Sequence, residues 1–366
     1  MVLSDNEIKE HIKTGSLTVE PLGEAILQPS SIDLPIGQKV WQVAGMPNLA
    51  AGFDPDKFIE DYTLNHFNVE VIEPTLLVGG VYLVELQTSV KFPEKVWGYI
   101  NPKSSAGRID LHCVVLARGS HDFNVIPAGY SGKLYMLIVP QSFPVRAFAG
   151  QALAQMRIYD GQRTFLTKEQ MQELHKTERL VANDDIEALI TDEGLHLHLD
   201  LKSNPRDLVA VRGGKPISLK IKDEIDPKIY FREKSTDSSG SLFLEPGEFI
   251  LAATIEKVRI PPTVCAEMVP YRQEHGELRS HYAGFFDPGF GYGDEGTISG
   301  ASVVCEIRNI GTVPIFLSHG QLITTFRCEY LPQKASASYG SGIFKSNYQS
   351  QQGIKLAKFF KPWEPS

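Results

Sequence analysis

The sequence has little cysteine, no long apolar run and no excess of positive charge. Its four cysteines, Cys113, Cys265, Cys305 and Cys328, lie far apart and never in a C-x-x-C spacing, which argues against a disulfide framework and a cysteine zinc site. No stretch of 18 apolar residues occurs, and the residues after Met1 do not resemble a signal peptide. We therefore expect a cytoplasmic protein that does not bind a membrane.

The charge balance also excludes a class of partners. Thirty-six basic residues against 44 acidic ones give a net charge of −8. Because a nucleic-acid-binding protein usually carries a basic surface, we expect no nucleic-acid partner, and any phosphate must be bound by a local cluster of donors. The length of 366 residues predicts about two globular domains.

The two halves of the chain repeat one another. Residues Leu76–Pro102 align on Leu244–Pro270 at a constant offset of 168, and seven of the 27 positions are identical. Composition alone would give roughly one or two identities. The segment 144–157 corresponds in the same way to 314–327, at an offset of 170. This pattern predicts a duplicated domain.

Each copy is predicted to be mainly β. Short apolar stretches bounded by glycine and proline favour a sandwich or a distorted barrel: Val81–Leu86, Lys133–Val139, Phe249–Thr254, Ala301–Ile307 and Leu322–Tyr330. Helices should be few. We expect one that begins after Ser4 and one that begins after Thr167, where a capping-box pattern leads to about Leu180. The predicted division is a first domain at 1–165, a helical linker between the copies at 166–195, and a second domain at 196–366.

One short segment has the composition of a phosphate-binding loop. Lys103–Arg108 reads Lys-Ser-Ser-Ala-Gly-Arg and follows a predicted strand. Hydroxyls, backbone amides and a guanidinium can all bind phosphate oxygens. The same composition is common in ordinary loops, so the motif alone leaves both interpretations open.

A zinc site is not expected. His275-Gly-Glu277 matches the H-x-E half of the signature of zinc-dependent nucleobase deaminases. The second half, P-C-x-x-C, is missing, and Cys305 and Cys328 are too far apart to bind one ion by local spacing.

Glu306 is an unusual residue for its surroundings. It lies in the apolar segment Val303–Asn309, which is predicted to be a strand, and shares a strand face with Val304 and Arg308. Either this face is exposed to solvent, or Glu306 is a buried carboxylate whose raised pKa suits a general base near neutral pH.

Taken in order, six stretches of the chain resemble the dCTP deaminases of the dUTPase-like superfamily, in the longer bacterial form with two tandem modules. These stretches are Leu3–Ile8 leading to Gly15–Pro21, Gln28–Leu34, Lys103–Arg108, Ala283–Gly289, Glu306–Asn309 and Asn347–Gly353. The resemblance implies two tandem dUTPase-like domains of the β-clip type, with a distorted barrel or jelly-roll and a few short helices. It also implies a homo-oligomer that hydrolyses dCTP to dUTP and ammonia without zinc, with Mg²⁺ bound through the triphosphate.

The resemblance assigns roles to individual residues. Glu306 matches the catalytic glutamate, which would accept a proton from the water that attacks cytosine C4. The matches to the phosphate-binding motif are Lys103, Ser104, Ser105 and Arg108.

Further matches concern the base and the C-terminal tail. Ala283 corresponds to a small residue of the cytosine pocket, and Asp287 to an aspartate that contacts the nucleotide. Tyr339 and Gln351 lie in the tail that closes over the nucleotide. Asn347 stands where the family usually has lysine, and Lys345, two residues away, is the candidate replacement.

The two copies have lost complementary motifs. The first copy keeps the phosphate loop but has no acidic residue from Phe123 to Tyr159. The second copy keeps Glu306 but reads Tyr271–Gly276, without the serine pair, where the phosphate loop would lie. We therefore expect one composite site per chain, formed either within one chain or between two.

Two other functions stay open at this point. One is a dUTPase-like pyrophosphatase, or a bifunctional enzyme that continues from dUTP to dUMP. The other is a non-catalytic nucleotide-binding protein, which the eroded motifs would allow. The insertion Tyr292–Thr297 is either a lid or a surface loop.

Overall fold

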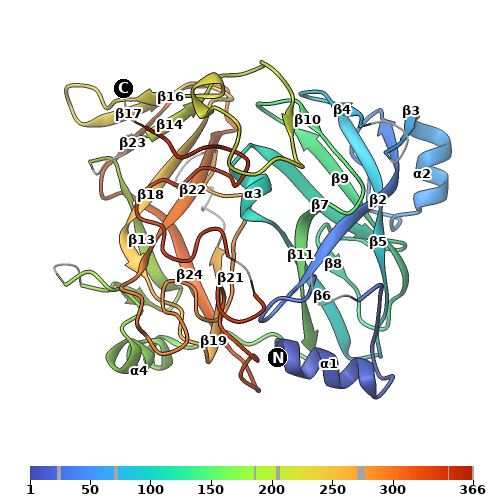
Figure 1. The fold of residues 1–366 in the computed structure, drawn as a ribbon, viewed down its shortest axis with the longest axis horizontal. Helices are drawn as coiled ribbons and strands as arrows, with labels where there is room; N and C mark the ends of the chain where they lie inside the picture. Colours follow the sequence, from blue (N-terminus) through green and yellow to red (C-terminus); the bar gives the residue numbers. More distant parts are fainter. Residues whose placement is uncertain are drawn as a thin grey trace.

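The protein consists of two β modules that lie side by side, as a computed structural model shows (Figure 1). The structure describes residues 1–22, 26–69, 73–184, 187–202, 207–269, 277–344 and 346–364. We call the first half of the chain module one and the second half module two. The predicted fold, mainly β with two tandem modules and a few short helices, is confirmed.

Module one is built on a nine-stranded sheet whose main path runs β7-β9-β5-β2-β11-β6-β8. The strands of this half are β1 (Thr18–Glu20), β2 (Ile32–Val43), β3 (Thr63–Asn68), β4 (Thr75–Leu76), β5 (Val81–Lys91), β6 (Val96–Pro102), β7 (Leu111–Ala117), β8 (Val125–Ile126), β9 (Ser131–Pro140), β10 (Val145–Arg146) and β11 (Ala152–Asp160). Strands β4 and β10 lie outside the nine-stranded sheet. The helices of module one are α1 (Asp5–Lys13), α2 (Pro55–Tyr62) and the single turn α3 (Ser104–Gly107).

Module two has a ten-stranded sheet whose main path runs β16-β14-β18-β13-β24-β19-β21. The strands of this half are β12 (Ile190–Thr191), β13 (Gly194–Asp200), β14 (Asp207–Ala210), β15 (Ile217–Ser218), β16 (Phe231–Lys234), β17 (Ser241–Leu244), β18 (Phe249–Val258), β19 (Val264–Val269), β20 (Leu278–Arg279), β21 (Phe285–Phe286), β22 (Ala301–Asn309), β23 (Ile315–Ser318) and β24 (Leu322–Tyr330). Strands β15, β17 and β23 lie outside the ten-stranded sheet. The helices of this half are α4 (Lys168–Glu178) and the 3-10 turn η1 (Pro227–Ile229).

Both capping patterns form as predicted. The Ser4 hydroxyl accepts a hydrogen bond from the Glu7 N–H at the start of α1, and Thr167 does the same for Gln170 at the start of α4. Helix α4 packs into the core of module two through Met171 and Leu174. The domain boundaries themselves stay a prediction.

One of the hydrophobic clusters extends across both modules. Strand β15 from the second half pairs in parallel with β10 of module one. Phe249 and Val304 of module two belong to the same buried cluster as the core of module one, and so does Phe359 near the end of the chain. Relative movement of the modules would expose this core, so the interface between them is well fixed. Among the described helices, none is long and apolar enough to cross a membrane.

The duplication is visible in the strand register. Leu83 on β5 pairs with Leu137 on β9, and its counterpart Leu251 on β18 pairs with Glu306 on β22. Leu137 therefore occupies in module one the position that Glu306 occupies in module two.

The face of module one that carries Leu137 is covered by other residues of module one. Phe53 and Phe58 pack in one cluster with Leu137, and the Phe53 ring lies 6.1 Å from that of Tyr135, centroid to centroid. Helix α2, which carries Phe58, lies on the side of module one away from module two (Figure 1). The corresponding face of module two, with Glu306, is covered instead by module one.

Candidate active site

A cleft of about 480 Å³ opens between the two modules. All the predicted site residues that the structure describes line it: Lys103, Ser104, Ser105, Arg108, Ala283, Asp287, Glu306, Tyr339 and Gln351. Lys345 lies outside the described residues. The structure thus brings the phosphate loop of the first copy and the candidate base of the second copy into one cavity of one chain.

The phosphate loop forms the module-one wall of the cleft. Lys103 directly follows β6. Its backbone N–H donates to the Leu153 carbonyl, and its ammonium pairs with the carboxylate of Asp33 on β2. The chain then turns through α3, so that Ser104 and Ser105 both reach the cleft.

Arg108 is a buried cation that forms no ion pair with the described residues. Its side chain is 3% exposed, its Nη1 donates to the Lys355 carbonyl at 2.6 Å, and its guanidinium lies 3.9 Å from the centre of the Tyr348 ring. Burial lowers the pKa of Arg108. Its Nε is buried without a hydrogen-bond partner in the described part of the chain. A buried guanidinium with a free donor suits an anionic ligand.

Glu306 is buried, which decides between the two interpretations of its strand face. It is 1% exposed, and its Oε2 accepts hydrogen bonds from the N–H groups of Tyr282 (2.8 Å) and Ala283 (3.0 Å). Burial raises the pKa of Glu306 to about 7, although these two bonds and the charge of Arg108 oppose the rise. A carboxyl group in this state can exchange a proton near neutral pH.

The sequence reasoning missed Asp110, which joins module one to the segment that holds Glu306. Asp110 is wholly buried, and its carboxylate accepts hydrogen bonds from Tyr282 Oη (2.6 Å), from Ser142 and from Arg308. Its φ of 55° is a backbone conformation that favours glycine. The only hint in the sequence is an acidic residue between the apolar residues Ile109 and Leu111. Tyr282 thus links Asp110 to the base.

Arg157 is a second residue that the sequence did not reveal. It is fully buried, reaches from β11 into module two and donates to the carbonyls of Ala266 (3.0 Å) and Phe286 (2.9 Å). Next to Phe286, Asp287 accepts a hydrogen bond from Ser30 Oγ at 2.7 Å. Burial raises the pKa of Asp287, and the charge of Arg157 is the main opposing effect.

The C-terminal tail is docked along the cleft. Gln351 donates through Nε2 to the Ser302 carbonyl at 2.6 Å, and the Tyr339 N–H donates to the Pro288 carbonyl at 2.8 Å. Asp294, in the 292–297 insertion, accepts a hydrogen bond from the Ser338 N–H at 3.0 Å. The insertion therefore holds the start of the tail.

The described part of the chain contains no group of three His, Cys, Asp or Glu side chains that could hold a metal ion. His275 and Gly276 lie outside the described residues, so the H-x-E motif is not described as a whole. All four cysteines are free and buried.

The fold and the cleft define a protein of two duplicated β modules with one polar cleft at their interface. The family model described as the N-terminal domain of 2'-deoxycytidine 5'-triphosphate deaminase matches residues 1–162. The model described as the C-terminal domain of the same enzyme matches residues 167–360. The chain belongs to the dCTP deaminase family.

Individual relatives agree with this assignment. The crystal structure of a 2'-deoxycytidine 5'-triphosphate deaminase from Agrobacterium tumefaciens is 30% identical, covers 92% of this chain and 99% of its own, and superposes with a TM-score of 0.83. A protein of Corynebacterium glutamicum named "dCTP deaminase, dUMP-forming" is 32% identical over 143 residues, which are 37% of this chain and 70% of that protein. A protein of Methanosphaera stadtmanae with the same name is 32% identical over 139 residues, 37% of this chain and 66% of its own. The name "dUMP-forming" differs from the dUTP product expected from the sequence.

Proposed function

We propose that this chain deaminates dCTP in the cleft between its modules, with Glu306 as the general base. The observation that carries the proposal is a buried carboxyl group, with its pKa raised to about 7, in the same cavity as a phosphate-binding loop. A base with a pKa near the working pH is deprotonated often enough to act and still basic enough to accept a proton.

The proposed reaction consumes one water molecule. Deprotonated Glu306 takes a proton from water as the oxygen attacks C4 of cytosine, and the protonated carboxyl then gives a proton to the amino group, which leaves as ammonia. The N–H groups of Tyr282 and Ala283 hold the carboxylate in one orientation during both transfers. Ala283, whose side chain is small, leaves room for the pyrimidine ring in this scheme.

The triphosphate would lie against the phosphate loop of module one. Ser104, Ser105 and the buried Arg108 offer hydroxyl and guanidinium donors, and Lys103 adds a positive charge. The described carboxylates that line the cleft are Asp33, Asp287 and Glu306, and each already accepts a hydrogen bond from Lys103, Ser30 or the backbone.

Because these three carboxylates already have partners, the cleft fits a Mg²⁺ ion that arrives bound to the triphosphate better than one held by protein side chains. The ion, when bound, neutralises phosphate charge. Zinc has no part in the proposal, and chelation of zinc with Mg²⁺ replenished is expected to leave the activity unchanged.

The product separates two candidate enzymes. Deamination alone gives dUTP, which we expect from the sequence. The names of the relatives favour a second candidate, in which water also attacks the α-phosphorus and pyrophosphate leaves, so that dUMP is the final product.

The test is incubation of the chain with dCTP and Mg²⁺, with ammonia, dUTP, dUMP and pyrophosphate all measured. Ammonia and dUTP without pyrophosphate would support the first candidate, and ammonia with equal amounts of pyrophosphate and dUMP the second. Pyrophosphate from dUTP without ammonia from dCTP would indicate a pyrophosphatase. Binding without turnover would indicate a non-catalytic nucleotide-binding protein and would overturn the proposal.

A further inference from the structure

The tail places an uncharged residue, Asn347, in the lining of the cleft. Asn347 stands where the family usually has lysine, and its amide carries no charge to replace that of an ammonium group. Among the described residues, three cations line the cleft, namely Lys103, Arg108 and Lys358. Lys358 lies eleven residues beyond Asn347.

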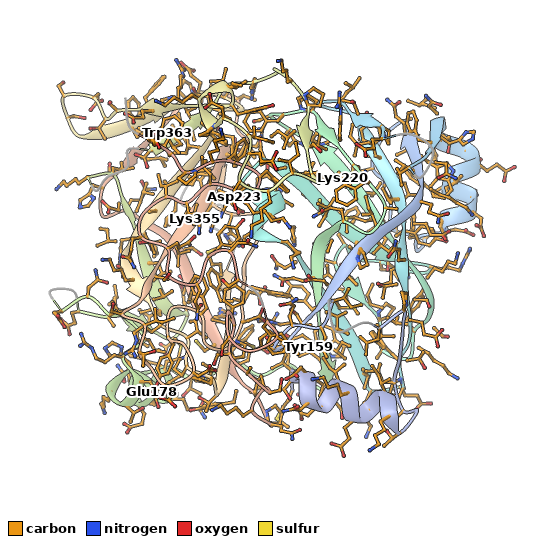
Figure 2. All side chains as sticks on the ribbon, viewed as in Figure 1. Tyr159, Glu178, Lys220, Asp223, Lys355 and Trp363 are labelled. Carbon is orange, nitrogen blue, oxygen red and sulfur yellow. The ribbon has the colours of Figure 1, made fainter. Side chains whose placement is uncertain are left out.

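The backbone around Lys358 is held by two hydrogen bonds to other residues of the second half of the chain. Its N–H donates to the phenol oxygen of Tyr348 at 3.2 Å, and its carbonyl accepts from the Asp223 N–H at 2.9 Å. The flanking residues Ala357 and Phe359 are buried in the core that module one shares with module two. Figure 2 shows Lys355 and Asp223 beside one another near the middle of the molecule. The position of Lys358 is therefore formed before any ligand binds.

The ammonium of Lys358 is half-buried and has no hydrogen bond or ion pair with the described residues. Burial lowers the pKa of Lys358, and the charge of Lys103 lowers it further, while Asp33 opposes both effects. The Asp33 carboxylate is already paired with Lys103. Two ammonium groups that repel one another across a cleft are stabilised when an anion lies between them.

We propose that Lys358 contacts the terminal phosphates of the dCTP triphosphate and takes the role that Asn347 cannot fill. This inference rests on the proposed function. Lys358 and Asn347 also line a second hollow, which opens beyond the cleft and carries Lys355 and Lys361. Lys358 therefore lies where the cleft and the second hollow meet, and we place the end of the triphosphate farthest from the base there.

The test is the binding of dCTP and dCMP to Glu306→Gln chains, which should bind nucleotide without turning it over. In this background we compare Lys358→Met, Lys358→Arg and Lys361→Met by calorimetry. Lys361 is exposed, lies on the same stretch and does not line the cleft, so it is the matched control. Lys358→Met should weaken dCTP binding about ten- to hundredfold and leave dCMP binding unchanged, because only a charge-assisted contact to the outer phosphates is lost. Lys358→Arg and Lys361→Met should bind dCTP within about twofold of the parent.

Other outcomes overturn the inference in distinguishable ways. Unchanged dCTP binding by Lys358→Met would remove Lys358 from the site and leave the proposed function untouched. An equal loss for dCTP and dCMP would show that Lys358 only supports the docked tail. No dCTP binding by the Glu306→Gln parent itself, under conditions in which it is folded, would overturn the proposed function and this inference with it.

Discussion

Gly107 of module one and Glu306 of module two meet across the interface so closely that a Cβ on Gly107 would stand 2.2 Å from Oε2 of Glu306. Gly107 lies in the single turn α3 and has no positive φ, so its backbone conformation does not require glycine. Glycine is required at position 107 because any larger residue would collide with the Glu306 carboxylate. The phosphate loop thus also forms one wall around the candidate base.

Substitution of Gly107 by alanine should therefore reduce deamination by a hundredfold or more. The added methyl group would push the Glu306 carboxylate from its hydrogen bonds with Tyr282 and Ala283, and misplacement of a reacting group by about 1 Å can cost about 10²-fold in rate. The measurement is kcat for dCTP. Gly45→Ala is the control, since a Cβ there meets no atom within 4 Å. Near-normal turnover by Gly107→Ala would mean that the carboxylate can act from another position.

The pH dependence of the reaction should report the raised pKa of Glu306. The base acts in its deprotonated form, so kcat/KM should be constant above pH about 7 and fall about tenfold per pH unit below it. A carboxyl group with the ordinary pKa of 4.5 would keep full activity down to about pH 5. The measurement is kcat/KM for dCTP with Mg²⁺ between pH 5 and 9. A profile that stays flat down to pH 5 would exclude a buried Glu306 as the base.

Tyr282→Phe should reduce kcat by about tenfold with little change in KM for dCTP. The substitution removes the hydrogen bond to Asp110 that fixes the segment whose N–H groups hold Glu306, and the buried carboxylate of Asp110 loses one donor. Tyr292→Phe is the matched control, because Tyr292 also donates its hydroxyl to a carboxylate, that of Glu178, but lies outside the segment whose N–H groups hold Glu306. Equal effects of the two variants on kcat would show that Asp110 does not help to position the base.

Leu137→Glu should not create a second base, although Leu137 holds in module one the position of Glu306. Leu137 is fully buried against Phe53 and Phe58, so an added carboxyl group would find no N–H donors of the kind that Tyr282 and Ala283 provide. We expect a loss of several kcal/mol in the free energy of unfolding. Leu64→Glu, at an exposed position on β3, should change it little. The measurement is denaturant unfolding of both variants. Unchanged stability of Leu137→Glu would contradict the burial of Leu137 against Phe53 and Phe58.

The sequence was sufficient for the parts of the structure that depend on local pattern. The capping boxes at Ser4 and Thr167 and the apolar stretches bounded by glycine and proline are local, and each formed a helix or a strand where it was expected. The duplication was visible because Leu83 and Leu251 occupy equivalent strand positions. The resemblance to the family then selected residues that the structure brings into one cleft.

Features that depend on contacts between the modules could not be predicted in this way. Nothing local indicates that Asp110 would accept hydrogen bonds from Tyr282 and Arg308, which are more than 170 residues away. The role of Gly107 also depends on a side chain from the other module. Lys358 was missed because its part in the cleft follows from the docking of the chain end on the core that both modules share. The predicted homo-oligomer depends on surfaces between chains and stays a prediction.

The central claim is that each chain forms one complete site from the phosphate loop of module one and Glu306 of module two. The direct test mixes Arg108→Ala chains with Glu306→Gln chains in equal amounts and measures deamination of dCTP. If the cleft described here is the site, neither chain has both parts, and the mixture should show no more activity than the two variants measured separately. A site shared between chains would instead combine the intact loop of one variant with the intact glutamate of the other and restore about a quarter of the wild-type activity, which would contradict the account.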